Sequence, residues 1–187
     1  NNKFKYIIMA IVKNTMIISF IAQIVTLFIG LSAQFIKLSK KYIILKQALA
    51  LENFVQFVEG SFYLWFILFY IKNVDKKDIA KYRYYDWFIT TPTMIISSIA
   101  YFQYNNTINT NLNGFTLFDF IKSDKINIIE ILIYNFFMLF FGYLQEINII
   151  SIYYSTFFGF LFFGLLFYKI YMYYAVYSQE NLLIFYL

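Results

Sequence analysis

Long apolar runs alternate with short polar links along this chain of 187 residues. A helix that crosses a bilayer needs about 20 mostly apolar residues, and several runs reach that length. The links between them are too short to separate independent modules, so we expect residues 1–187 to form a single, all-α membrane domain. We predict spanning helices at about 6–30, 42–71, 82–101, 126–144 and 149–174, and the start of another helix at about 179–187.

The polar stretches between these runs indicate how the helices are joined. Asn and Thr dominate residues 103–114, which we interpret as a loop. Residues 115–121 are expected to form a short amphipathic or β element that lies over the bundle. The last helix stops at Leu187 after about two turns, which is too short to cross a bilayer. We therefore expect the chain to be incomplete at its C-terminus.

The composition agrees with a lipid-facing exterior. Hydrophobic residues make up 61% of the chain and charged residues 13%, with a mean hydropathy of +0.63. Soluble domains carry about 25% charged residues, so we expect an integral, multi-pass membrane protein with the lipid bilayer as a partner. The net charge of +5 comes mainly from lysines at the ends of apolar runs. We therefore do not expect nucleic-acid binding.

Cys and His are both absent from the chain. Their absence excludes disulfides and Cys or His metal sites, and we expect no metal. Histidine-based acid–base chemistry is excluded as well, so proton transfer would use carboxylates, Tyr or Lys. The chain has no Gly-rich phosphate loop and no Ser-based nucleophile motif, so we do not expect an enzyme.

The third run contains the string R-Y-Y-D-W-F-I-T-T-P at residues 83–92. Arg83, Asp86 and Thr90 are spaced at i, i+3 and i+7, and Ser97 follows Asp86 by eleven residues, so the four share one helix face. A charge inside a span costs about 2.5–3.5 kcal/mol on insertion scales, so this face should point into the bundle. The pair alone also fits an Arg–Asp contact that only fixes topology.

The full string resembles the third helix of microbial rhodopsins, where R-Y-x-D-W-x-x-T-T-P is the most recognisable stretch. The resemblance implies a seven-helix bundle that binds retinal, of which about five complete helices are present here. It further implies that Asp86 is the counterion of the protonated retinal Schiff base, with Arg83 and Thr90 as its partners. Ser97 falls where outward proton pumps carry a carboxylic proton donor. The resemblance also implies a homo-oligomer.

Further positions resemble the retinal pocket of that family. Met138 and Gly142 are one turn apart in the fourth run, and Gly159 follows in the fifth. The alternative is that a Met or a Gly in an apolar helix serves packing alone. The pocket that the resemblance implies consists of Trp87, Thr91, Met94, Met138, Gly142, Gly159 and Phe163.

The second run carries Glu52, Gln56 and Glu59 within two helical turns. They are either neutral and hydrogen-bonded inside the bundle or part of a polar path for cations that also includes Ser97. Asp, Thr and Ser in the third helix with two glutamates in the second resemble the rhodopsins of large algal-infecting viruses, one branch of which is described as light-gated cation channels. The alternatives are a light-driven outward proton pump and a truncated, photochemically inactive membrane protein.

The lysine that binds retinal in the family lies midway along the seventh helix, and no candidate for it is found in this chain. Besides Lys46, which is close to the start of its run, Lys13 and Lys169 are the only lysines within the predicted spans. We expect Lys169 to extend towards the membrane interface instead of forming a Schiff base. Retinal is therefore expected in the full-length parent, without a covalent link to this chain.

Overall fold

The computed structural model describes residues 2–70, 79–107 and 114–186, and all regular structure in these ranges is helical. Two short π-helices prolong the helices that precede them: η2 (Phe66–Tyr70) follows α2, and η4 (Tyr171–Ala175) follows α6. The other elements are α1 (Asn2–Gln34), η1 (Lys40–Tyr42), α2 (Ile43–Trp65), α3 (Ile79–Thr107), α4 (Leu117–Ser123), α5 (Lys125–Glu146), α6 (Ile152–Ile170) and α7 (Gln179–Tyr186).

Five long helices and the shorter α4 and α7 in the described ranges confirm the predicted all-α architecture. Three segments, Ile11–Gln34, Lys125–Glu146 and Ile152–Ala175, are both long and apolar enough to cross a membrane. Helices α2 and α3 have 23 and 29 residues. At about 1.5 Å per residue they also exceed the roughly 30 Å of a bilayer core. Their lower hydropathy reflects the charged residues that they carry.

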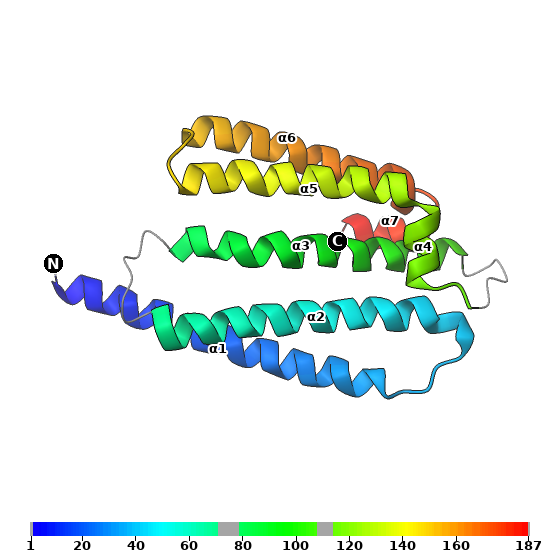
Figure 1. Ribbon diagram of the computed structural model, residues 1–187, viewed down its shortest axis with the longest axis horizontal. Helices are drawn as coiled ribbons and strands as arrows, with labels where there is room; N and C mark the ends of the chain where they lie inside the picture. The colour runs from blue at the N-terminus through cyan, green and yellow to red at the C-terminus, as the bar shows by residue number, and fades with distance from the viewer. Residues whose placement is uncertain (1, 71–78, 108–113, 187) are drawn as a thin grey trace.

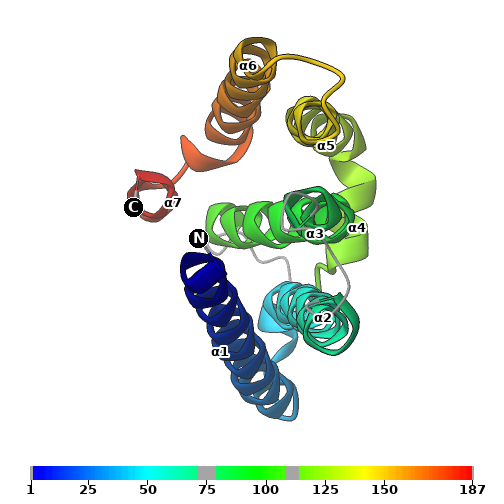
Figure 2. The ribbon, with the colours of Figure 1, turned by 90° about the vertical axis from the view of Figure 1, so that its left-hand side faces the viewer.

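The long helices pack in chain order and run alternately in opposite directions (Figure 1). Helix α1 packs on α2, α2 on α3, α3 on α5, and α5 on α6, while α7 turns back against α3 and η4 (Figure 2). The buried apolar core lies towards the end of the bundle that α4 covers. It includes Ile44 of α2, Ile99 of α3, Phe120 of α4, Ile131 of α5 and Tyr174 of η4.

The expectation of a loop beginning at residue 103 was wrong, and the short element expected at 115–121 is a helix. Helix α3 continues to Thr107, through the first part of the predicted loop, because Tyr104 and Asn105 are buried there against neighbouring elements. Residues 117–123 form the helix α4 and no β element. A capping box with Thr116 and Asp119 starts this helix, and the hydrogen bonds from Thr116 lower the pKa of the Asp119 carboxyl.

Asn181 fixes the short helix α7 to the rest of the bundle. Its side chain is fully buried and lies among polar groups of two other elements, α3 and η4. Asn181 Nδ2 donates to Phe102 O at 2.9 Å and to Asn106 Oδ1 at 2.8 Å, both in α3. Its Oδ1 accepts from Asn105 Nδ2 at 2.8 Å. Both Asn181 and Asn106 also donate to Tyr174 O in η4, so a single amide joins α7 to α3 and to the end of α6.

Candidate functional site

Helix α3 carries the rhodopsin-like string at residues 83–92 and remains helical across Pro92. Proline has no amide hydrogen to donate to the preceding turn. Threonine hydroxyls on both sides of it bond to backbone carbonyls one turn earlier. Thr91 Oγ1 donates to Trp87 O at 2.8 Å, and Thr93 Oγ1 donates to Ile89 O at 2.8 Å. The regular backbone keeps the predicted polar positions in line along one face of α3.

Asp86 lies inside the bundle without a polar partner. Its side chain is 3% exposed, and neither carboxylate oxygen has a hydrogen-bond partner. Thr90 is fully buried one turn later, but its hydroxyl donates to the backbone carbonyl of Asp86 at 3.1 Å instead of to the carboxylate. The structure therefore places both residues in the interior, as expected for their shared face, and leaves the carboxylate group unpaired.

Arg83 makes no hydrogen bond to this carboxylate and reaches Tyr63 of α2 instead. Its Nη1 donates to the hydroxyl of Tyr63 at 2.8 Å, and the guanidinium lies over the rings of Tyr63 and Trp87, 5.3 and 5.2 Å from their centroids. It lines a cavity of about 240 Å³ between α1, α2 and α3. The carboxyl group of Glu59 interacts electrostatically with both Arg83 and Asp86, so these three charged side chains form one group.

Trp87 and Gly142 meet around Tyr84, where α3 packs on α5. The rings of Tyr84 and Trp87 are in edge contact, with centroids 5.1 Å apart. Gly142 leaves space for the tyrosine, because a Cβ at this position would lie 2.4 Å from the Tyr84 hydroxyl. The predicted pocket positions Trp87 and Gly142 are therefore brought together through a residue that the sequence analysis did not single out.

Thr91 has a buried partner on α5 that the sequence analysis also missed. Its hydroxyl and the side chain of Asn135 are hydrogen-bonded, with Asn135 Nδ2 3.0 Å from Thr91 Oγ1. Asn135 is 3% exposed, and an amide within an apolar run is the signal that could have identified it. Met138 lies one turn further along α5 and is half-buried.

The remaining pocket positions lie apart from this group. Met94 of α3 is on the wall of a larger cavity. Phe163 of α6 packs its ring against Phe167, with centroids 4.6 Å apart. A Cβ at Gly159 would meet no atom within 4 Å. Gly159 and Phe163 are one turn apart on α6, and Phe167 continues their face to the cavity that Met94 lines.

The polar side chains of α2 form hydrogen bonds with two different helices, α1 and α3. Glu59 accepts a hydrogen bond from Gln23 of α1, and Gln56 accepts one from Thr26 of α1 at 2.8 Å. Glu52 instead accepts a hydrogen bond from the Ser97 hydroxyl of α3. Of the predicted path residues, Glu52 and Ser97 are therefore in direct contact, whereas Gln56 and Glu59 lie along the seam between α1 and α2.

A cavity of about 650 Å³ adjoins the Glu52–Ser97 pair. Helices α2, α3, α6 and α7 surround it, and most of its wall is apolar. The carboxyl of Glu52 and the hydroxyls of Ser97 and Ser98 supply polar groups on its α2 and α3 sides. The pair thus connects the interior of the helix bundle with a space large enough for water or a small ligand.

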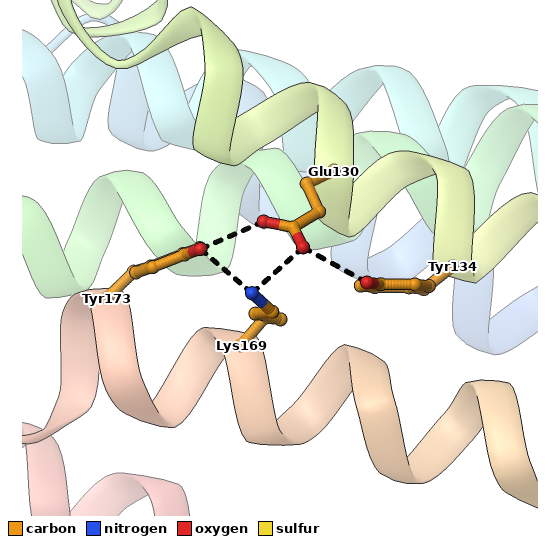
Figure 3. Close-up of polar contacts among 4 residues, drawn as sticks. All are labelled: Glu130, Tyr134, Lys169 and Tyr173. Carbon is orange, nitrogen blue, oxygen red and sulfur yellow. Dashed lines mark hydrogen bonds and ion pairs between the residues drawn. The ribbon is translucent and has the colours of Figure 1, made fainter.

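A second polar cluster joins α5 to α6 and was not anticipated (Figure 3). Lys169 Nζ lies 2.8 Å from Glu130 Oε1 and donates to the Tyr173 hydroxyl at 3.0 Å. Tyr173 and Tyr134 both donate to the Glu130 carboxylate, at 2.8 and 3.0 Å. This ion pair joins the amino group of Lys169 to α5, and our expectation that Lys169 extends towards the interface stays a prediction. Opposite charges in neighbouring apolar runs were the available signal.

Comparisons with known proteins agree with this architecture. A family model described as Bacteriorhodopsin-like protein matches residues 14–182. No match was found among curated proteins. The crystal structure of viral rhodopsin OLPVRII is similar, with a TM-score of 0.78 and 26% sequence identity over 94% of this chain and 76% of that chain. Because the family model covers most of the sequence, this chain belongs to the bacteriorhodopsin-like family of multi-pass membrane proteins, the microbial rhodopsins, which generally bind retinal.

Proposed function

We propose that this chain is part of a light-gated cation channel in which Asp86 neutralises a protonated retinal Schiff base. The observation that carries the proposal is a carboxylate that is 3% exposed and has no hydrogen-bond partner at either oxygen. An unpaired buried carboxylate is costly, and a fixed cation beside it removes that cost. Retinal linked to a lysine as an iminium ion supplies such a cation and absorbs visible light.

The residues around Asp86 fit this chromophore. Trp87 and Thr91 follow Asp86 on α3, and Gly142 of α5 leaves space for Tyr84. The open space beside Gly159 fits the proposal that the pocket extends to α6. Met94, Met138 and Phe163 would complete the pocket's apolar wall, and the lysine that carries the retinal would come from outside residues 1–187.

The cation path of this proposal runs along α2. Carboxylates and amides that line a membrane pathway favour cations. Glu59 and Gln56 stand between α1 and α2, and Glu52 meets Ser97 at the edge of the 650 Å³ cavity. Each group is hydrogen-bonded across a helix interface, so movement between two helices would change the path directly.

A light-driven outward proton pump is the second candidate, and one contact supports it. Outward pumps carry a carboxylic proton donor where this chain has Ser97. The carboxyl of Glu52 is hydrogen-bonded to Ser97, so a carboxyl group stands beside the donor position although it comes from another helix. Glu52 would then return the proton in place of the missing donor.

Photocurrents distinguish the two candidates. The chain would be joined to a sixth and seventh helix that carry the retinal lysine, taken from the viral rhodopsin to which it is similar, and expressed in cells supplied with all-trans retinal. We expect a visible absorption band and a light-induced current that reverses sign with membrane voltage. A current of one sign at all voltages would establish the pump. If the protein showed no visible band and no current, both the channel and the pump would be refuted.

Charge-neutralising variants test the residues assigned here. Asp86→Asn should shift the absorption band, because it removes the proposed counterion. Glu52→Gln and Glu59→Gln should reduce the channel current while leaving the band in place. Glu146→Gln, at the end of α5 and away from the proposed path, is the matched control and should leave the current unchanged. An unshifted band in Asp86→Asn would contradict the counterion role.

Assembly into a homo-oligomer stays a prediction, measurable by crosslinking.

A further inference from the structure

Lysines and large apolar side chains are both exposed at the end of the bundle that α4 covers. The link between α1 and α2 exposes Phe35 by 87% and Ile36 by 57%. Phe118 of α4 is 71% exposed, and Ile126 in the first turn of α5 is 82% exposed. Apolar groups next to amino groups are typical of segments that lie in the membrane interface. The exposed lysines of this basic belt are Lys37, Lys40, Lys41, Lys122 and Lys125.

Hydrogen bonds hold both parts of the basic belt against the helices. Gln34 Nε2 donates to Lys46 O at 3.0 Å, and Lys46 Nζ donates to Ile36 O at 3.3 Å, which ties the link to the first turns of α2. The first amide of α4, at Leu117, donates to Gln47 Oε1 at 2.6 Å. The link and α4 therefore lie at the same end of the bundle, on the right in Figure 1.

The acidic residues of this end are fewer and are engaged with other groups. Asp119 accepts hydrogen bonds from Thr116, and Asp124 accepts from Tyr174 and Asn127. Glu180 is exposed at the start of α7. Together with Lys46, the basic belt has six lysines beside these three acidic residues, which leaves a net charge of +3.

We infer that the basic belt binds the headgroups of anionic phospholipids in the membrane leaflet that it faces. Lys37, Lys40 and Lys41 meet the headgroups on one side of the bundle, and Lys122 and Lys125 meet them on the other. Phe118 and Ile126 enter the acyl region between these groups. Each lysine near such a surface strengthens binding by up to about fivefold. This inference concerns the lipid surroundings and does not depend on whether the chain forms a channel or a pump.

Native mass spectrometry of the detergent-solubilised 187-residue chain tests the inference. The probes are phosphatidylglycerol and phosphatidylcholine with the same acyl chains. We expect phosphatidylglycerol to bind at least about tenfold more tightly at low salt. Substituting Lys37, Lys40, Lys41, Lys122 and Lys125 by Gln should remove this preference. The control K13Q/K81Q, which neutralises two basic residues nearer the other end of the bundle, should keep it.

Two further measurements use the unmodified chain, so they do not depend on whether a variant folds. Raising NaCl from 50 to 500 mM should reduce the preference of the unmodified chain for phosphatidylglycerol. Salt screens the lysine charges, because the Debye length shortens as salt rises and reaches roughly 3 Å near 1 M. Inorganic phosphate should not displace phosphatidylglycerol at equal concentration, because it lacks acyl chains to contact Phe118 and Ile126. Equal affinity for the two lipids, a preference that survives high salt, or displacement by phosphate would each overturn the inference.

Discussion

Gly30 of α1 lies so close to Asn53 of α2 that we expect Gly30→Ala to destabilise the protein. A Cβ on residue 30 would lie 1.9 Å from Asn53 Oδ1 and 3.0 Å from its Cγ. Asn53 is 7% exposed, so its side chain has little room to turn away. Overpacking of this kind costs up to about 3 kcal/mol, and alanine returns about 1 kcal/mol through its higher helix propensity. We expect a net loss of about 2 kcal/mol.

Thermal unfolding followed by circular dichroism measures this loss. In a chain of this length about 1 kcal/mol corresponds to 2–4 °C in Tm, so Gly30→Ala should melt about 4–8 °C lower than the unmodified chain. Gly60→Ala is the matched control on the same helix interface. Its Cβ would lie 3.6 Å from the Cβ of Gln23, an ordinary contact. The control should therefore keep or slightly raise the Tm.

A second substitution tests the cause of the loss. Asn53→Ala removes all three atoms that the new methyl group would meet, and the Asn53 Nδ2 has no hydrogen-bond partner to lose. The double variant G30A/N53A should therefore melt close to Asn53→Ala alone, a non-additive result expected for residues in contact. An unchanged Tm in Gly30→Ala, or the same loss with and without Asn53, would refute the steric argument for this interface.

Three further predictions concern other contacts. Gly142→Ala should lower the Tm because its Cβ would lie 2.4 Å from the Tyr84 hydroxyl, whereas Gly159→Ala, with no atom within 4 Å, should not; equal melting of the two would contradict this. Asn181→Ala should expose α7 to proteolysis before the long helices, because it removes the amide that binds α7 to α3; unchanged protection would show that apolar contacts suffice. The lowered pKa of Asp119 means that its capping box stabilises α4 above the ordinary carboxyl pKa of about 4 and loses this effect as the pH falls through the lower folded value. Hydrogen exchange of α4 should therefore rise in acid, and Asp119→Asn should remove this pH dependence.

The sequence predicted the long helices well because apolar runs of this length have few alternatives in a membrane. The predicted 126–144 and 149–174 correspond closely to α5 and to α6 with η4. The error at 103–107 has a physical reason. Asn and Thr indicate a loop when they face water, but Asn105 is 7% exposed and bonded to Asn181. Which polar side chains find partners is decided by the neighbouring helices, and one sequence does not specify these pairings.

The same limit explains Arg83. Helical spacing predicts which side of α3 carries Arg83 and Asp86, and α3 does place Asp86 in the interior. An arginine side chain is long enough to reach several groups, so its direction depends on the donors, acceptors and rings nearby. Tyr63 offers both a hydroxyl at 2.8 Å and a ring face, and Trp87 offers a second ring. The contact with Tyr63 does not follow from the motif, because Tyr63 belongs to α2, whereas Trp87 lies one turn after Arg83 on α3 itself.

A comparison of the carboxylates within the described helices shows why Asp86 stands apart. Glu52 is bonded to Ser97, Glu59 to Gln23, and Glu130 to Lys169 and two tyrosines. A carboxylate inside a long helix is therefore not by itself a sign of function in this bundle, because these three partly buried glutamates have partners from a neighbouring helix. Asp86 is more buried than these and has none. A carboxylate without a hydrogen-bond partner in low dielectric is the property that the proposed counterion role requires.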